Sequence, residues 1–172
     1  AGLARLVTAL ENTSRAAVDT EFVREQTYYP QLCLIQIATA EQVACVDVLA
    51  TLDLEPLFAQ LFRPDFTWVV HSARQDLEVV YQRAQRMPPR LVDTQVAAAL
   101  TGYPPQVELE GLLERALGVT LGESFARTDW SRRPLPEAPL HYALDDVRHL
   151  LAACDRLDAE LARLGRADWL RE

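Results

Sequence analysis

The sequence predicts an α/β fold. Three short apolar segments, 16–18, 32–37 and 43–48, follow one another with brief connections, as the strands of an antiparallel meander do. The apolar segment 67–70 then runs directly into a helical pattern, which is the βα unit that builds parallel sheets. With 172 residues, 49% of them hydrophobic, the chain is long enough to bury a core. We therefore expect a single domain over residues 1–172.

Helical and extended patterns alternate in the first half of the chain. Apolar residues at helical spacing predict a helix over 3–12, after which a short apolar strand leads into Asp19 and places the first acidic pair at a strand end. Residues 32–37 are too apolar for a strand with one wet face, so a buried strand is expected. A short helix over 54–62 ends before Pro64, which cannot continue a helix.

The helix after strand 67–70 carries a second acidic residue of interest. Its expected buried stripe consists of residues at helical spacing, namely Leu77, Val80, Tyr81 and Ala84. Asp76 lies four residues before Val80, so its side chain borders this stripe and faces the sheet. Glu78 points in another direction, and we expect it in solvent.

The second half begins with a brief strand at 91–92. Asp93 is well placed to cap a helix over 94–101, and a further helix is expected over 108–117. Residues 118–137 contain glycines and prolines among polar groups, which predicts a long loop of the kind often kept for function.

One final helix is expected to begin near Pro136. Its apolar face consists of Leu140, Leu144, Val147, Leu151 and Cys154. Tyr142 and Asp146 are four residues apart, so their side chains lie one above the other beside this face.

Acidic residues recur in three of these settings. Asp19 and Glu21 are separated by one residue, so a strand directs both side chains to the same face. Asp76 faces the sheet from its helix, and Asp146 follows Tyr142 by one helical turn. Taken singly, each acid also suits a turn, a helix start or a solvated surface. The three histidines lack the compact spacing of a metal site.

Together, the four carboxylates and the phenol predict a metal-dependent phosphodiesterase. Two divalent cations about 3.5–4 Å apart can clamp a phosphodiester and activate the attacking water. Mg²⁺ and Mn²⁺ select carboxylate oxygens as ligands. Because like charges repel, such a cluster of acids indicates a bound cation. Tyr142 would be placed to hydrogen-bond the attacking water.

Charge and cysteine content limit how the protein can bind nucleic acid and in which compartment it can act. The net charge of −8 excludes a protein that coats nucleic acid through bulk electrostatics, so a polyanion must bind at a local patch. Every basic residue is Arg, which offers planar, bidentate phosphate donors. The three cysteines show no C-x-x-C spacing, which indicates a reducing cytoplasm and neither disulfides nor zinc. The apolar run 32–38 is interrupted by Gln36 and is too short to span a membrane, so we expect no membrane partner.

Four stretches carry a specific combination of motifs: 19–24 (DTEFVR), 27–32 (TYYPQL), 127–130 (RTDW) and 133–135 (RPL). This combination, which extends over nearly the whole chain, resembles the catalytic domain of ribonuclease D. It is similar to the wider group of 3′→5′ exonucleases named for four acids and a tyrosine. The resemblance implies a ribonuclease H-like three-layer α/β/α fold with a mixed sheet.

The resemblance also implies a role for each site residue. Asp19, Glu21, Asp76 and Asp146 would hold two divalent ions, Mg²⁺ or Mn²⁺, with Asp19 bridging both. Glu21 and Asp146 would complete the site of the metal that delivers the attacking water, and Asp76 would support the second metal. Tyr142 would orient that water. The implied reaction releases nucleoside 5′-monophosphates one at a time from RNA 3′ ends, such as those of transfer RNA precursors.

Arg132 or Arg133, in the loop before the last helix, is our expected phosphate contact. Family members tend to carry Lys after the residue that matches Leu121, where this chain has Gly122. The family's catalytic domain usually opens with a further strand and is followed by small helical nucleic-acid-binding domains, and we expect neither within residues 1–172.

Two alternatives to an exoribonuclease stay open at this point. The first is a DNA 3′→5′ exonuclease with the same site, because no residue identifies how a 2′-hydroxyl would be read. The second is a non-catalytic RNA-binding module, against which the complete set of four acids and a tyrosine counts. The sequence does not distinguish between oligomeric states.

Overall fold

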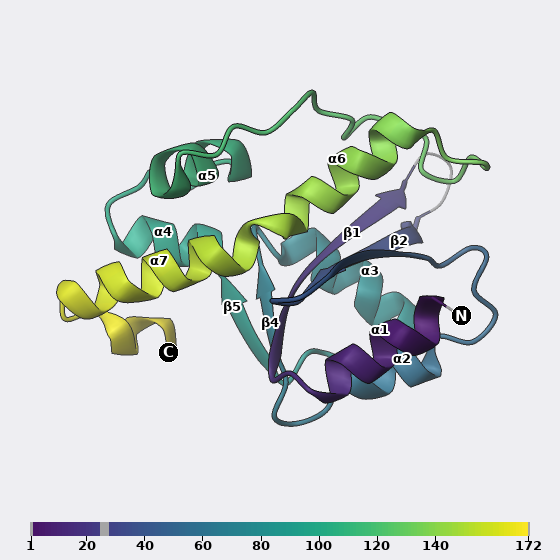
Figure 1. Cartoon of the computed structure of the whole chain (residues 1–172), viewed down its shortest axis with the longest axis horizontal. Helices are drawn as coiled ribbons and strands as arrows, with labels where there is room; N and C mark the ends of the chain where they lie inside the picture. Colours follow the sequence, from purple (N-terminus) through teal and green to yellow (C-terminus); the bar gives the residue numbers. More distant parts are fainter. Residues whose placement is uncertain (1, 25–27, 172) are drawn as a thin grey trace.

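A five-stranded mixed sheet runs through the centre of the protein (Figure 1). The computed structural model describes residues 2–24 and 28–171. The strands are β1 (Arg15–Val23), β2 (Gln31–Ala38), β3 (Val43–Asp47), β4 (Thr67–Val70) and β5 (Arg90–Asp93). Their order in the sheet is β3-β2-β1-β4-β5, with β3, β2 and β1 antiparallel and with β4 and β5 parallel to β1. The expected meander and the βα unit are both confirmed.

Helices cover both faces of this sheet. They are α1 (Gly2–Glu11), α2 (Glu55–Leu61), α3 (Arg74–Ala84), α4 (Thr94–Leu100), α5 (Leu109–Leu117), α6 (Glu137–Arg148), α7 (Leu150–Arg163) and the 3₁₀ helix η1 (Ala167–Arg171). The first three pack on one face through the main apolar cluster, and α6 and α7 lie on the other, with α4 and α5 against α7 (Figure 1). The predicted α/β fold, a mixed sheet flanked by helices, is therefore confirmed.

Strand β1 is longer than its apolar pattern indicates. We expected the acidic pair Asp19 and Glu21 at its end, but the strand continues to Val23 because β2 pairs with it up to that residue. The pairing includes a β-bulge, at which β2 carries the extra residue Cys33 opposite the step from Glu21 to Phe22. Thr27, the first residue of the predicted TYYPQL motif, lies outside the described residues.

Two expectations about helices were wrong. The final helix is two helices, because the chain breaks at His149, where α6 ends and α7 begins. In α3 the buried residues are Asp76, Val79 and Val80, whereas Tyr81 is 47% exposed. Leu77 and Ala84 are partly buried against the same apolar cluster, so the stripe is displaced around the helix by about one residue, from Tyr81 toward Val79.

The end of β4 creates the opening in which the acids lie. Strand β4 pairs with β1 only from Arg15 to Ala17, so β1 extends well beyond the point where β4 ends at Val70. After Val70 the chain turns into α3 and crosses beside the uncovered edge of β1. Asp93, as expected, caps α4 by accepting a hydrogen bond from the Gln95 N–H at 2.9 Å.

Trp68 on β4 is fixed by packing and by one hydrogen bond. Its indole Nε1 donates to the Leu61 carbonyl oxygen at 2.7 Å, and the side chain is fully buried. Trp68→Phe should lower the free energy of unfolding by about 2 kcal/mol, since it leaves a cavity and an unpaired carbonyl. Urea denaturation measures this loss. Trp169→Phe, at an exposed tryptophan, is the control, and equal losses in both variants would contradict the assignment.

Candidate active site

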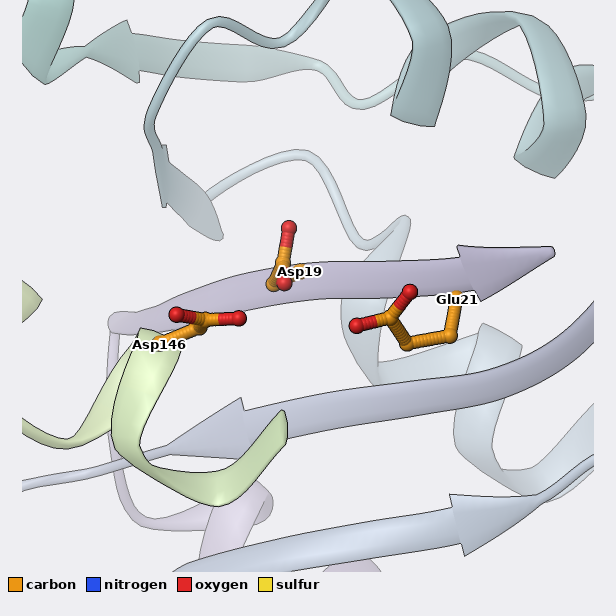
Figure 2. A group of neighbouring side chains, drawn as sticks. All are labelled: Asp19, Glu21 and Asp146. Carbon is orange, nitrogen blue, oxygen red and sulfur yellow. The ribbon is translucent and has the colours of Figure 1, made fainter. Parts of the chain in front are cut away.

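Three carboxylates meet on one face of β1. Asp19 and Glu21 are two residues apart on the strand, so both side chains point to the face covered by α6. Helix α6 brings Asp146 to the same point. One oxygen from each of the three carboxylates lies within 4.8 Å of the others. Figure 2 shows the Glu21 and Asp146 carboxylates turned toward each other, with Asp19 between them.

Asp76 approaches the same group from the opposite side of β1. It lies in the first turn of α3, it is buried, and it accepts a hydrogen bond from the Thr20 hydroxyl. This contact confirms that Asp76 faces the sheet. Glu78 is half exposed and pairs with Arg24 at 2.7 Å, so it is directed away from the acids.

The turn that sets the position of Asp76 is held by Asp93. Ser72 adopts a left-handed backbone conformation with φ 59°, which is unfavourable for a residue other than glycine. The Asp93 carboxylate accepts hydrogen bonds from the N–H groups of Ser72 and Ala73, both at 3.0 Å. Sequence reasoning assigned Asp93 only to capping α4. The structure adds that this one carboxylate also fixes the start of α3.

Tyr142 lies one turn before Asp146 on α6, as expected. Its hydroxyl hydrogen-bonds the Asp146 carboxylate, and its ring lies 6.2 Å from that of Phe125 in the long loop 118–136. Burial, together with the charges of Asp146 and Glu21, raises the pKa of Tyr142 above its usual value. The phenol therefore stays protonated at neutral pH and keeps a proton to donate.

Burial and mutual repulsion make the four acids hard to ionise together. Burial is the main cause that raises the pKa of Glu21 to about 9, of Asp146 to about 7 and of Asp76 to about 6. Burial, with the charges of Asp76, Asp146 and Glu21, also holds the pKa of Asp19 well above its ordinary value. A cation at this point would remove the repulsion. Because all the donors are hard carboxylate oxygens, the set fits Mg²⁺ or Mn²⁺.

The acids and Tyr142 line a cavity of about 690 Å³. In the part of the chain that the structure describes, Arg74 is the arginine in its wall, and His71 lies beside it. The His71 ring nitrogens are each 2.9 Å from an oxygen, Thr94 Oγ1 and the Val107 carbonyl, so both nitrogens of this histidine are occupied by local hydrogen bonds. A larger cavity of about 900 Å³ lies between β2 and α3 and contains none of the four acids.

Neither arginine that we expected to contact phosphate lines the cavity with the acids. Arg133 binds Asp47 through two nitrogens, at 2.7 and 2.6 Å, and also donates to the Trp130 carbonyl. It therefore fastens the loop to the end of β3. Arg132 is exposed on the same loop. No local signal connects Arg133 with Asp47, which is 86 residues away, whereas Arg74 could have been favoured because it is two residues from Asp76.

Fold and site together define a class of protein, the α/β exonucleases that carry four acids and a tyrosine. The chain belongs to the 3′-5′ exonuclease family, which matches it over residues 1–162. It is 43% identical over 173 residues to a ribonuclease D of Nitrobacter hamburgensis, with 100% of this chain and 45% of that protein covered. It is 45% identical over 160 residues to a ribonuclease D of Jannaschia sp., with 90% and 42% covered. The expected resemblance to ribonuclease D is therefore confirmed.

Solved structures give the same result. Escherichia coli RNase D, described as an exoribonuclease involved in structured RNA processing, superposes with a TM-score of 0.90 at 42% identity, covering 95% of this chain and 44% of that one. The catalytic core of RRP6 from Trypanosoma brucei has a TM-score of 0.88 at 30% identity, with 96% and 46% covered. Brucella melitensis NrnC with bound Mg²⁺ has a TM-score of 0.82 at 26% identity, with 92% and 79% covered. The chain spans less than half the length of its ribonuclease D relatives.

The electrostatic cost of the site can be measured without metal. In EDTA at pH 8, Asp146→Asn should raise Tm by roughly 5 °C, since about 3 °C corresponds to 1 kcal/mol in a chain of this size. The sign follows from the raised pKa, because the folded state binds a proton at Asp146 more tightly than the unfolded state does. The stabilisation that protonated Asp146 contributes is therefore lost as pH rises through about 7. The gain should shrink as pH falls below about 7 and disappear below about pH 3, where wild-type Asp146 is protonated in both the folded and the unfolded state.

Asp145→Asn is the matched control. Asp145 is the preceding residue, but it is more exposed and pairs with Arg148 at 2.8 Å. Its replacement should leave Tm unchanged or slightly lower. A gain at Asp145 equal to that at Asp146 would show that overall net charge, and not crowding at the site, sets the effect.

Proposed function

We propose that this chain is a catalytic domain that removes nucleoside 5′-monophosphates from RNA 3′ ends. The observation that carries the proposal is the meeting of Asp19, Glu21 and Asp146 within 4.8 Å, with Asp76 and Tyr142 in the same cavity. Membership of the 3′-5′ exonuclease family supports the direction of cleavage. The ribonuclease D relatives support RNA as the substrate.

Two divalent ions, Mg²⁺ or Mn²⁺, would be held by the four acids. In this proposal Glu21 and Asp146 hold one ion, Asp76 supports the other, and Asp19 contacts both. When bound, the ions supply an activated water and stabilise charge on the phosphate. The Mg²⁺ bound to NrnC of Brucella melitensis supports the choice of metal.

The remaining cavity residues would orient the substrate. The protonated Tyr142 hydroxyl, held beside Asp146, would position the attacking water by a hydrogen bond. Arg74 lies in the cavity wall and would contact a phosphate of the RNA strand. Arg132 would contact the strand outside the cavity, whereas Arg133 is engaged by Asp47.

Transfer RNA precursors would be a substrate class of this activity, and the protein would act in the cytoplasm. The free state of Cys33, Cys45 and Cys154 supports a reducing compartment. Across residues 2–24 and 28–171, no helix is both long and apolar enough to cross a membrane.

A cleavage time course tests the proposal. Single-stranded RNA and matched DNA, both 5′-labelled, are incubated with Mn²⁺, Mg²⁺ or EDTA and resolved on a sequencing gel. We expect a metal-dependent ladder that shortens from the 3′ end of RNA and is absent with Asp19→Asn. An equal ladder on DNA would indicate a general exonuclease. Binding of RNA without any cleavage would indicate a non-catalytic module.

Tyr142→Phe tests the role of the phenol. Turnover of RNA should fall by about tenfold to hundredfold because the hydroxyl that positions water is lost. The Mn²⁺ concentration that half-saturates the thermal shift should not change, since Tyr142 is not a proposed ligand. Tyr81→Phe, an exposed tyrosine on α3, is the control. A fully active Tyr142→Phe would refute the role.

A further inference from the structure

Gln36 on β2 is buried without a hydrogen-bond partner. Its side chain has 0% exposure, and within the part of the chain that the structure describes neither its Nε2 nor its Oε1 is paired. Buried amides are nearly always satisfied, and an unpaired one costs about 1–3 kcal/mol. The burial of this unpaired amide therefore needs an explanation, because a leucine or methionine could fill the same space without that cost.

The sheet register places Gln36 beside a proposed metal ligand. Gln36 is the direct partner of Asp19 on β1 and of Cys45 on β3. Side chains of directly opposed residues in antiparallel strands lie on the same face, with Cβ atoms about 4.5–5.5 Å apart. Asp19, Gln36 and Cys45 thus form a row across the sheet, on the face that also carries Glu21.

Helix α6 covers this row on the face of the sheet that carries the three side chains. Leu34 and Ala38, the residues two before and two after Gln36, pack against Ala143 and Val147 of α6 respectively. Both α6 residues are fully buried. The Gln36 amide is therefore buried between the sheet and α6, and its partners in the strand ladder are Asp19 and Cys45.

We propose that Gln36 is a positioning residue for Asp19, whose carboxylate accepts a hydrogen bond from the Gln36 Nε2–H when metal is bound. The inference rests on the metal site of the proposed function. An ionised carboxylate only accepts hydrogen bonds, so the amide must turn its NH₂ group to Asp19 and its oxygen to Cys45. The Cys45 thiol can donate weakly to that oxygen. Burial raises the pKa of Cys45 to about 12, so it keeps its proton.

The contact would serve the metal site in two ways. A donated hydrogen bond offsets part of the charge on Asp19, which Asp76, Asp146 and Glu21 otherwise repel. It also fixes the direction of the carboxylate before the ions bind. Groups that orient metal ligands in this manner typically contribute a factor of about 10–100 in metal affinity.

Gln36→Met tests the inference, because methionine keeps the shape of the side chain and removes its polar atoms. Thermal unfolding of the whole chain is followed during titration with Mn²⁺. We expect the midpoint of the Mn²⁺-dependent shift to rise at least about tenfold. The Tm in EDTA should stay the same or rise, since no existing hydrogen bond is lost. Gln36→Leu should give the same shift in midpoint.

Gln42→Met is the matched control. Gln42 also has a buried, unpaired Nε2, but it lies at the turn between β2 and β3, outside the strand pairing that places Gln36 opposite Asp19. Its Mn²⁺ midpoint should equal that of the wild type. A wild-type midpoint in Gln36→Met, or an equal rise in Gln42→Met, would overturn the inference and leave the metal site standing. If the wild type shows no Mn²⁺-dependent shift at all, the metal site falls, and this inference falls with it.

Discussion

Repulsion among the four acids gathered around β1 is the constraint on which the rest of the structure depends. Asp19 and Glu21 are held by the sheet ladder, whereas Asp76 and Asp146 come from helices on opposite faces. Because each acid belongs to a hydrogen-bonded strand or helix, the backbone positions of the four are fixed relative to one another. A low-dielectric surrounding strengthens the repulsion. The packing of both helix layers on the sheet therefore has to offset the unfavourable electrostatic free energy of bringing the four carboxylates together. A bound cation would make that electrostatic free energy favourable.

Contacts outside the four acids hold them together against this repulsion. Asp93 holds the turn before α3, so the position of Asp76 depends on a residue at the end of β5. Arg133 fastens the long loop to Asp47 on β3, and that loop packs Phe125 beside Tyr142. Each of these contacts connects an edge strand with a segment of the site. The two edge strands of the sheet thus help to hold the segments that surround the acids at its centre.

Local patterns in the sequence were enough to predict most of the elements, because an apolar run or a helical period is set by burial of the nearest surface. They gave wrong bounds where contacts with distant segments determine how far an element extends. β1 continues to Val23 only because β2 pairs with it, and the chain breaks at His149 where it passes from the sheet to α4 and α5. In the site, the spacing of Asp19 and Glu21 is local, and so is that of Tyr142 and Asp146. Their convergence, however, depends on the packing of α6 on the sheet, and no local rule supplies it.

The bulge at Cys33 has a consequence for the shape of the sheet. Strand pairing on the side of Asp19 and Gln36 is in one phase, and pairing beyond Phe22 is in another, because the extra residue takes up the difference. A bulge bends the strand that carries it and increases the local twist. Because this bulge lies beyond the pair formed by Glu21 and Leu34, the bend leaves the row of Asp19, Gln36 and Cys45 in the regular ladder. The alignment of side chains beneath the acids is thus kept apart from the curvature of β2.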